Sequence, residues 1–485
     1  MVKKEINDYD PPIKDIEKQA TGIFKSFLFE NNPLYDSIIY SNIRASIKEW
    51  TLLSKEEATP YLPLNQEPVS VDLGIKDTKN YSLPTLSVIN LDSAIPYKRG
   101  HLINFGGVIS GLEYIPKTTH SKDSNRQQYL SIGGLKAPCT DFAYEGEKKS
   151  YPNAIQIWRC DLSAAADDNN NSSKNGNSIE NQSTASSTPS ISLDLCILHD
   201  FGDVRELKWC PYGAYDDENE ENEKKGKGKD DVNQSIAKLG ILAACFGDGS
   251  LRIIVVPHPN VLRRKQNIGL DKTIFLKIKK PRYTISFTNS IITTISWGGH
   301  KKLAVGTSSG YISVWNMEAA FQANTTDNDV LPKKYMLFNN LVHDAGVQEI
   351  EWHGINDPVN FASIGNDGRF LFINIEDPFV PILFWRHRSI QYSLTWPGYR
   401  NRIYFSDSDL KVRERSVDDC TEFKQGQFYT EGRGYCFSIA SSEVHSFIIH
   451  GSSDGFVSFN NVYVQRIRGT VIKSTICSIP INLQR

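Results

Sequence analysis

The sequence predicts an all-β fold built from a repeated unit of short strands. The clearest copy of the unit lies at residues 198–259, where apolar strand patterns flank a charged insert. Gly247-Asp248-Gly249 separates two apolar runs, and an Asp-Gly pair in that position is the strongest short-range sign of a β-hairpin. Equivalent units recur along the chain, and this recurrence is the second observation behind the predicted fold.

Six copies of the unit are recognisable. Their first strands read GLEYIP (111–116), ELKWCP (206–211), TISWGG (294–299), EIEWHG (349–354), SLTWPG (393–398) and CFSIAS (436–441). Four of them carry tryptophan at one register, namely Trp209, Trp297, Trp352 and Trp396. The last three are 55 and 44 residues apart, close to the ~40–45 residues of a WD40 blade. The pattern predicts a WD40-type β-propeller with these indoles packed between blades, rather than forming a binding stripe.

The repeats and the segments around them define the expected domain organisation. We expect seven blades, the seventh combining early strands within 69–90 with residues 464–481; six blades is the alternative. Residues 1–65 have apolar residues at loosely helical spacing and are predicted to be a partly helical N-terminal arm, with 39–50 as one short helix. The propeller then occupies residues 66–485.

Two low-complexity inserts interrupt the predicted propeller, at about 163–190 and 216–236. The first is rich in Asn and Ser and the second is dominated by charged residues. Both are too poor in apolar groups to fold alone, so we predict disorder. Both fall at strand connections, where extra length adds little closure entropy.

Composition excludes several classes of protein. The formal net charge is −2, so nucleic acid or membrane attraction would have to be local. The eight cysteines are scattered without zinc-type spacing and are expected to be buried, reduced thiols. The N-terminus lacks a signal-peptide core, and no run approaches the ~18 apolar residues of a membrane helix. We therefore expect a soluble intracellular protein that does not contact membranes.

No residue pattern points to catalysis, a cofactor or a metal. The chain has no P-loop, GxSxG, HExxH or EF-hand motif. His199-Asp200 and His343-Asp344 precede strands at equivalent places in two repeats, which favours structural turns over a site. WD40 blades often contain a buried His, Ser/Thr, Asp and Trp tetrad, and the predicted remnants are His199, Thr307 with Trp315, and His343 with Asp367.

Two basic groups are the candidate contact residues for nucleic acid or a partner. The first comprises Arg263, Arg264, Lys265, Lys279, Lys280 and Arg282. The second comprises Trp385, Arg386, Arg388, Arg400, Arg402, Lys411, Arg413 and Arg415. Such residues neutralise phosphates or stack on bases and aromatic side chains. A solvated propeller rim and a protein-binding face remain alternatives.

The sequence of residues 198–259 resembles that of the WD-repeat subunit of transcription factor TFIIIC. The matching pattern is LHDFG at 198–202, LKWCP at 207–211 and, after the insert, LGILA at 239–243, the Asp248-Gly249 hairpin and PHP at 257–259. This residue pattern is more specific than the pattern of generic WD repeats. Similarity extends weakly over 290–415 and does not cover the first 65 residues.

The resemblance implies a nuclear, non-enzymatic scaffold without a cofactor. In that family such a subunit joins a second propeller subunit and the large winged-helix subunit to recognise the B-box of RNA polymerase III genes, chiefly tRNA genes. Family members often carry a long basic N-terminal extension, whereas the arm here is short and mixed in charge, which favours a scaffold over direct contact with promoter DNA. The alternatives are a WD40 adaptor of a ubiquitin-ligase or chromatin complex and a propeller that binds nucleic acid directly.

Overall fold

A computed structural model describes most of the chain. The described residues are 39–74, 78–91, 95, 100–117, 127–136, 148–161, 191–211, 214–216, 235–323, 329–354, 357–388, 390–398, 401–417, 427–431, 434–442, 447–461 and 475–480. The predicted insert at 163–190 lies outside them, as do residues 1–38 of the predicted arm.

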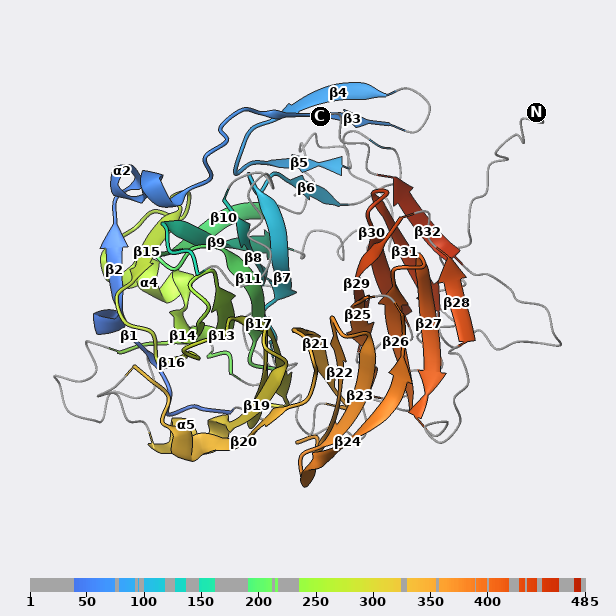
Figure 1. The fold of residues 1–485 in the computed structure, drawn as a ribbon. Helices are drawn as coiled ribbons and strands as arrows, with labels where there is room; N and C mark the ends of the chain where they lie inside the picture. Colours follow the sequence, from blue (N-terminus) through green and yellow to red (C-terminus); the bar gives the residue numbers. More distant parts are fainter. Residues whose placement is uncertain are drawn as a thin grey trace, which may run out of the picture. The chain divides into compact units, whose positions relative to one another are not determined.

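Six sheets follow one another along the chain (Figure 1). The first begins with β7 (Val108–Tyr114), β8 (Gln127–Leu135), β9 (Asn153–Asp161) and β10 (Ile191–His199). The second contains β11 (Val204–Trp209), β13 (Lys238–Phe246), β14 (Leu251–Pro257) and β16 (Tyr283–Ile285). The third contains β17 (Ile292–Gly298), β18 (Lys302–Thr307), β19 (Tyr311–Asn316) and β20 (Met336–Leu341).

The remaining three sheets repeat this plan. The fourth contains β21 (Val347–Trp352), β22 (Asn360–Gly365), β23 (Arg369–Asn374) and β24 (Asp377–Arg386). The fifth contains β25 (Gln391–Thr395), β26 (Arg402–Asp407), β27 (Lys411–Ser416) and β28 (Gln427–Glu431). The sixth contains β29 (Cys436–Ser441), β30 (Phe447–Ser452), β31 (Phe456–Asn461) and β32 (Thr475–Pro480). Their first strands are the six that the sequence predicts.

A bulge at one position shows that these sheets are copies of a single unit. It interrupts the pairing of the first strand with the second strand and raises the local twist. It occurs in five of the first strands, between Ile109 and Gly111, Val204 and Glu206, Ile292 and Thr294, Val347 and Glu349, and Cys436 and Ser438.

The fold is an all-β propeller with six blades, so the expectation of seven is wrong. The early strands β3 (Val69–Leu73) and β4 (Lys79–Leu83) pair only with each other, and β5 (Val88–Asn90) pairs with β6 (His101–Ile103). β32, at the end of the chain, pairs with β31 and completes the sixth sheet. The strands that the seventh blade required are therefore already used elsewhere.

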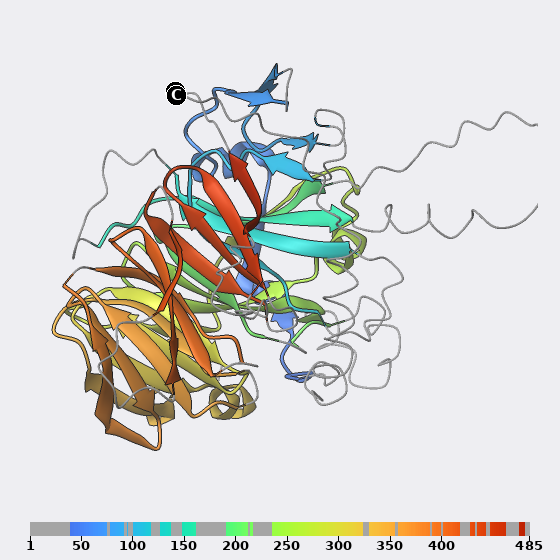
Figure 2. The same cartoon turned by 90° about the vertical axis from the view of Figure 1, so that its right-hand side faces the viewer.

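The described residues form two compact units, each treated separately below. The first unit spans residues 39–392 and holds the first four blades. The second unit spans residues 393–480 and holds the last two, drawn in orange and red in Figure 2. The boundary falls within β25.

An excursion of the chain enlarges the first blade to six strands. After β14 the chain forms α4 (Pro259–Gln266) and then β15 (Ile274–Ile278), which pairs in parallel with β10 of the preceding blade. β2 (Trp50–Leu53) from the N-terminal segment then pairs antiparallel with β15. The chain returns through β16 to finish the second blade.

The described part of the N-terminal arm differs from the helix expected at residues 39–50. It contains the two-residue strand β1 (Ala45–Ser46), which pairs with β12 (Ser235–Ile236), followed by the 3₁₀ turn η2 (Ile47–Glu49). Ser46 caps η2 reciprocally with Glu49. Strand pairing satisfies the backbone groups on both sides of the turn, so a continuous helix does not form. The short helices α2 (Lys55–Ala58) and η3 (Thr59–Tyr61) follow.

Residues at both ends of the second predicted insert belong to the described part of the chain. Ser235 and Ile236 form β12, and Asp216 is 2% exposed. Residues 217–234 lie outside the described part of the chain.

Tryptophan links each blade of the first unit to the blade before it. Trp209 donates its Nε1–H to Ser131 Oγ on β8 at 2.7 Å. Trp297 donates to the Lys208 carbonyl at 3.2 Å, and Trp352 donates to the Ser296 carbonyl at 3.1 Å. The prediction that the registered indoles lie between blades is confirmed for these three.

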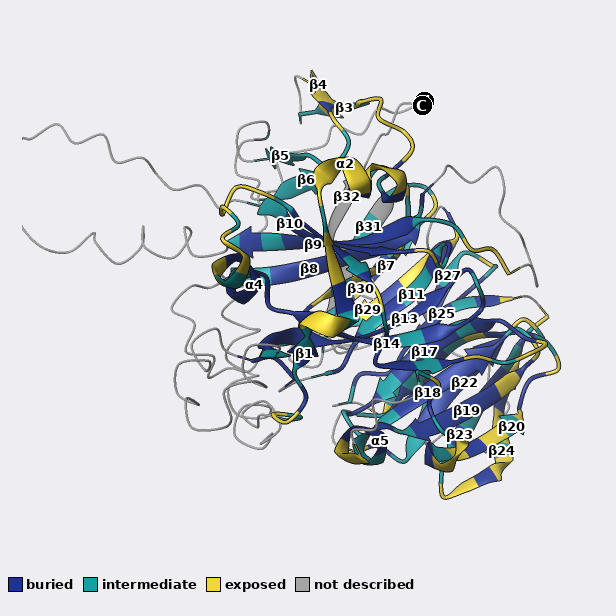
Figure 3. Cartoon of the chain, turned by 90° about the vertical axis from the view of Figure 1, so that its left-hand side faces the viewer, coloured by how far each residue is buried: buried dark blue, intermediate teal, exposed yellow. Residues whose placement is uncertain are grey.

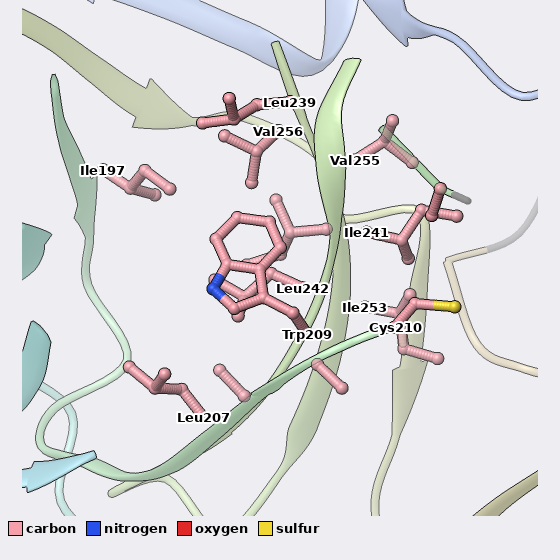
Figure 4. Close-up of a cluster of buried hydrophobic side chains, with 14 of the residues drawn as sticks. Ile197, Leu207, Trp209, Cys210, Leu239, Ile241, Leu242, Ile253, Val255 and Val256 are labelled. Atoms are coloured by element: carbon pink, nitrogen blue, oxygen red, sulfur yellow. The ribbon is translucent and has the colours of Figure 1, made fainter. Parts of the chain in front are cut away.

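The surroundings of Trp209 show why its register is fixed (Figure 4). The indole lies between Ile197 of β10 and the apolar side chains of β13 and β14, including Leu242 and Val256. A Cβ atom on Gly240 would stand 2.8 Å from the indole ring, so only glycine permits the ring to lie flat on β13. Burial of such a large aromatic surface is a main source of blade-to-blade stability.

Cysteine burial agrees with the sequence interpretation where it is described. Cys160, Cys196, Cys210, Cys245 and Cys436 are free and buried. Burial raises the pKa of the Cys196 thiol to about 12, which disfavours the reactive thiolate. Among the described residues, no helix is long and apolar enough to cross a membrane.

A buried ion pair fixes the start of the described chain to the second blade. Lys238 on β13 is 0% exposed and its Nζ lies 2.5 Å from Asp216 Oδ1. The same Nζ donates to the Tyr40 carbonyl at 3.1 Å, and the Tyr40 hydroxyl donates to the His300 carbonyl at 2.7 Å. The ion pair therefore joins three segments that are distant in sequence.

We predict that Lys238→Met destabilises the protein by about 3–5 kcal/mol, because it leaves the Asp216 carboxylate buried without its cation. The double variant Lys238→Met with Asp216→Asn should recover most of this loss, because it removes both charges. Urea unfolding of the full chain measures both values. Equal losses in the single and double variants would contradict a charge-based explanation.

Candidate functional site

The LHDFG stretch runs from the end of β10 into the turn before β11 and serves the interior of the fold. His199 is 0% exposed, its Nδ1 accepts a hydrogen bond from the Phe201 amide at 3.3 Å, and its ring stacks on the Phe201 ring. Burial lowers the pKa of His199 to about 3, so the imidazole is neutral. The neighbouring Asp200 forms an ion pair with Lys277 at 2.7 Å. These contacts support the structural interpretation of the His-Asp pair.

The PHP stretch has an equally structural role. His258 is the N-cap of α4, and its Nδ1 accepts a hydrogen bond from the Asn260 amide at 3.3 Å. Its Nε2 lies 2.9 Å from the Tyr215 hydroxyl, and burial lowers its pKa to about 3. Pro259 occupies the first helical position, where its fixed φ suits the turn.

The predicted tetrad remnant is present in the fourth blade. His343 Nδ1 lies 3.0 Å from Asp367 Oδ1, and His343 Nε2 lies 2.9 Å from Ser363 Oγ. Burial would raise the pKa of Asp367, but hydrogen bonds from His343 and from the backbone amides of Arg369 and Asp344 lower it to about 2. The arrangement locks the turn before β21 to β22.

The predicted remnants in the third blade do not bond to each other. Trp315 donates its Nε1–H to Ser313 Oγ at 3.0 Å. Thr307 instead bonds to the backbone of Tyr311, closing the hairpin.

Two residues of the first basic group are buried. Arg263 is 3% exposed, pairs with Asp194 and donates to the carbonyls of Gly269 and Lys272. Arg282 is 8% exposed and pairs with Glu49 at 2.8 Å. Neither guanidinium is available to a phosphate or a partner, because each is used to join segments of the first unit.

The other members of the first group lie nearer the surface. Lys265 donates to the Ser235 carbonyl at 2.7 Å, and Lys280 pairs with Asp329 at 3.0 Å while remaining 40% exposed. Arg264 and Lys279 are exposed. The adjacent Lys277 donates to the Tyr61 hydroxyl at 2.6 Å, and its hydrogen bonds to Asp200 and Tyr61 raise its pKa.

The second basic group is divided between the two units. In the first unit Arg386 and Arg388 are exposed. The ring centroids of Trp385 and His387 lie 4.9 Å apart. In the second unit Lys411 is half-buried and Arg402 pairs with Glu414 at 2.7 Å.

The remaining arginines of the second group are Arg400, Arg413 and Arg415. Arg413 is 7% exposed and pairs with Asp407 at 2.5 Å, and Arg415 is 4% exposed. Both side chains are therefore buried within the second unit. Arg400 lies outside the described residues.

A charged cluster that the sequence patterns did not predict lies on the first strands of the first unit. Glu113 of β7 accepts a hydrogen bond from the Trp209 amide of β11 at 2.5 Å. Glu206 of β11 accepts one from the Ile295 amide of β17 at 2.8 Å. Each carboxylate thus bonds to the backbone of the next blade. The available signal was the alternation of charged and apolar residues in LEY, ELKW and EIEW.

The electrostatics of this cluster centre on Lys208, which follows Glu206 on β11. Withdrawal from water favours a neutral Lys208, but the carboxylates of Glu206, Glu113, Glu351 and Glu349 outweigh this effect and raise its pKa. Withdrawal from water also raises the pKa of Glu206, and it raises the pKa of Glu113 from 4.5 to about 7. Glu113 is therefore partly protonated near neutral pH.

We predict a pH-dependent stability that Glu113→Gln removes. Between pH 4.5 and about 7 the folded chain retains a proton on Glu113 that the unfolded chain has released, so stability falls as pH rises through this window and is level above it. Gln cannot titrate but still accepts the bond from the Trp209 amide. Urea midpoints at the two ends of the window should therefore differ less in Glu113→Gln than in the parent chain.

The exposed Glu67, changed to Gln, is the matched control and should keep the parent profile. A Glu113→Gln profile equal to that of the parent chain would contradict the assignment.

No protein-family model matches the chain. Transcription factor tau subunit sfc6 of Schizosaccharomyces pombe is 22% identical over 374 residues, 76% of this chain and 51% of that protein. General transcription factor 3C polypeptide 2 from Homo sapiens and from Pongo abelii is 22% identical over 352 residues. That alignment covers 69% of this chain and 35% of each relative.

The chain thus spans about half the length of the first relative and about a third of the other two. The six-bladed propeller and the alignments agree with the resemblance carried by residues 198–259. The relatives are subunits of transcription factor TFIIIC, and this chain is homologous to them over 69–76% of its length.

Proposed function

We propose that this chain is a non-enzymatic scaffold subunit of a TFIIIC-type factor in the nucleus. Its role is to hold other subunits together, namely a second propeller subunit and the large winged-helix subunit, so that the assembly recognises the B-box of tRNA-type genes. The assembly then supports initiation by RNA polymerase III. The observation that carries the proposal is the homology to TFIIIC subunits over 69–76% of the chain.

The geometry of the described residues favours a scaffold over an enzyme. The His-Asp pairs that precede β11 and β21 have structural partners on the same or neighbouring strands. The residues of the distinctive LHDFG and PHP stretches cap a helix, stack in the core or form ion pairs within the chain. A propeller with such internal bonding is a rigid platform, and its loops and edges are the parts that meet partners.

Direct contact with promoter DNA has weaker support. Arg263, Arg282, Arg413 and Arg415 are buried, and Arg402 pairs with a carboxylate. Phosphate contacts need accessible cations. We therefore assign promoter binding to the assembly, and a generic adaptor of another complex is the competing proposal.

Depletion of the chain from a nuclear extract of its own organism should reduce transcription of a tRNA gene several-fold and leave an RNA polymerase II template unaffected. Adding back the purified chain with its co-purifying subunits should restore the activity. Affinity purification of the tagged chain from the same extract should recover the winged-helix subunit. Recovery of ubiquitin-ligase components without polymerase III factors would instead support the competing adaptor.

Reversal of the exposed cations of the first group tests direct DNA contact. We expect Arg264→Glu with Lys279→Glu to leave the salt dependence of promoter binding by the assembled factor unchanged. Mobility shifts from about 50 to about 200 mM salt measure the slope of log affinity against log salt. That slope would become shallower by about 0.9 for each phosphate that the variant no longer neutralises.

Lys48→Glu with Lys55→Glu changes the net charge equally at exposed positions of the N-terminal segment and is the control. A shallower slope in the first variant alone would show that this chain contacts phosphates.

A further inference from the structure

The last strand of the fourth blade exposes apolar side chains along its length. On β24, Phe379 is 78% exposed and Val380 is 66% exposed. Ile382 and Leu383 are 47% and 41% exposed. Phe384 is 2% exposed and packs edge-on against Phe370, which anchors the strand to its sheet. Much of β24 is accordingly drawn in the exposed colour in Figure 3.

This exposure departs from that of an ordinary outer strand. Successive residues of a strand point to opposite faces, so a strand on a packed sheet alternates buried and exposed positions. On β24 the exposed residues come as consecutive pairs, Phe379 with Val380 and Ile382 with Leu383, so both faces present apolar groups to solvent. β24 is also the terminal strand of its sheet, so its far edge lacks a strand partner among the described residues.

The apolar surface continues onto the last strand of the third blade. Asn340 of β20 donates to the Pro378 carbonyl of β24 at 3.0 Å, and Leu337 and Leu341 of β20 are 49% and 59% exposed. Six exposed apolar side chains thus lie on two strands that are joined by a hydrogen bond. Clustered exposed apolar groups of this kind mark an interaction site.

The charges at the two ends of β24 have opposite sign. Glu376 and Asp377 are exposed where the strand begins, and Arg386 and Arg388 are exposed where it ends. Within the described residues none of these four side chains takes part in an ion pair. The midpoint between Asp377 and Arg386 falls between Pro381 and Ile382, at the centre of the apolar run.

We propose that β24 is a self-association surface whose occupant is the β24 strand of a second copy of this chain. An antiparallel arrangement about a twofold axis at the midpoint places the acidic end of each strand opposite the basic end of the other. The same axis places the apolar centres together. A parallel arrangement would oppose like charges, so the pattern selects the antiparallel one. A twofold contact of this kind is closed and ends at a dimer.

The two prolines of β24 define the type of contact. Pro378 and Pro381 have no N–H to donate, so a continuous backbone ladder between the two copies does not form. Proline on an edge strand also limits open-ended pairing. The association therefore depends on apolar side chains and the two sets of end charges, and we expect a weak, reversible dimer in the micromolar range.

Reversal of the charges at one end of β24 or the other tests the proposal. Sedimentation velocity of the full chain should show a monomer at low and a dimer at high micromolar concentration. Arg386→Glu with Arg388→Glu should weaken dimerisation at least tenfold, because acidic ends then face acidic ends. Glu376→Lys with Asp377→Lys should weaken it similarly. An equimolar mixture of the two variants should recover parental affinity, because every contact in the mixed dimer again joins opposite charges.

The control carries Lys48→Glu with Lys55→Glu, which alters net charge equally and should dimerise like the parent. Recovery in the mixture also shows that both variants are folded. A parent chain that stays monomeric over the whole concentration range would overturn the proposal. That result would favour another protein as the occupant of β24. A mixture that dimerises no better than its components would also overturn the proposal.

Discussion

The hydrogen bond from an indole N–H to the preceding blade is the constraint on which the first unit depends. A four-stranded sheet is too small to bury its own faces, so each blade is stable only against its neighbours. Trp209, Trp297 and Trp352 fill the space between successive blades and direct their one polar atom to an oxygen of the blade before. The bond fixes the orientation of a large apolar ring that would otherwise slide between flat surfaces. The carboxylates of Glu113 and Glu206 repeat the device with the backbone of the next blade.

Around this frame the chain uses its charged residues mainly to hold distant segments together. Arg282 binds Glu49, Lys277 binds Asp200 and Tyr61, and Lys238 binds Asp216 and Tyr40. These basic residues thus form ion pairs and hydrogen bonds within the chain. Arg264 and Lys279 of the first basic group and Arg386 and Arg388 of the second remain exposed. The contact proposed for β24 depends instead on exposed apolar side chains and on the charges at the two ends of the strand.

The sequence predicts the repeated unit well because its signals are local. Strand alternation, the Asp248-Gly249 hairpin and the Trp register all act within one blade, and the six first strands appear where expected. The missed features are non-local. The parallel pairing of β15 with β10 depends on a chain excursion that no short pattern encodes. The burial of Arg263 depends on Asp194, a residue in the preceding blade. Helical spacing at residues 39–50 was overridden because β12 and β15 offered strand partners.

The pairing of β2 with β15 also affects the order in which parts of the fold can form during synthesis. Glu49 and Arg282 are 233 residues apart in the sequence, so at ~5–20 residues per second the N-terminal segment waits roughly 10–50 s for its partner to leave the ribosome. Once β10 (Ile191–His199) has been made, and until β15 (Ile274–Ile278) follows, the last strand of the first blade has neither β15 nor β2 to cover it. The nascent chain therefore carries an unfinished sheet edge until β15 has been made, when only β16 of the second blade is still to come.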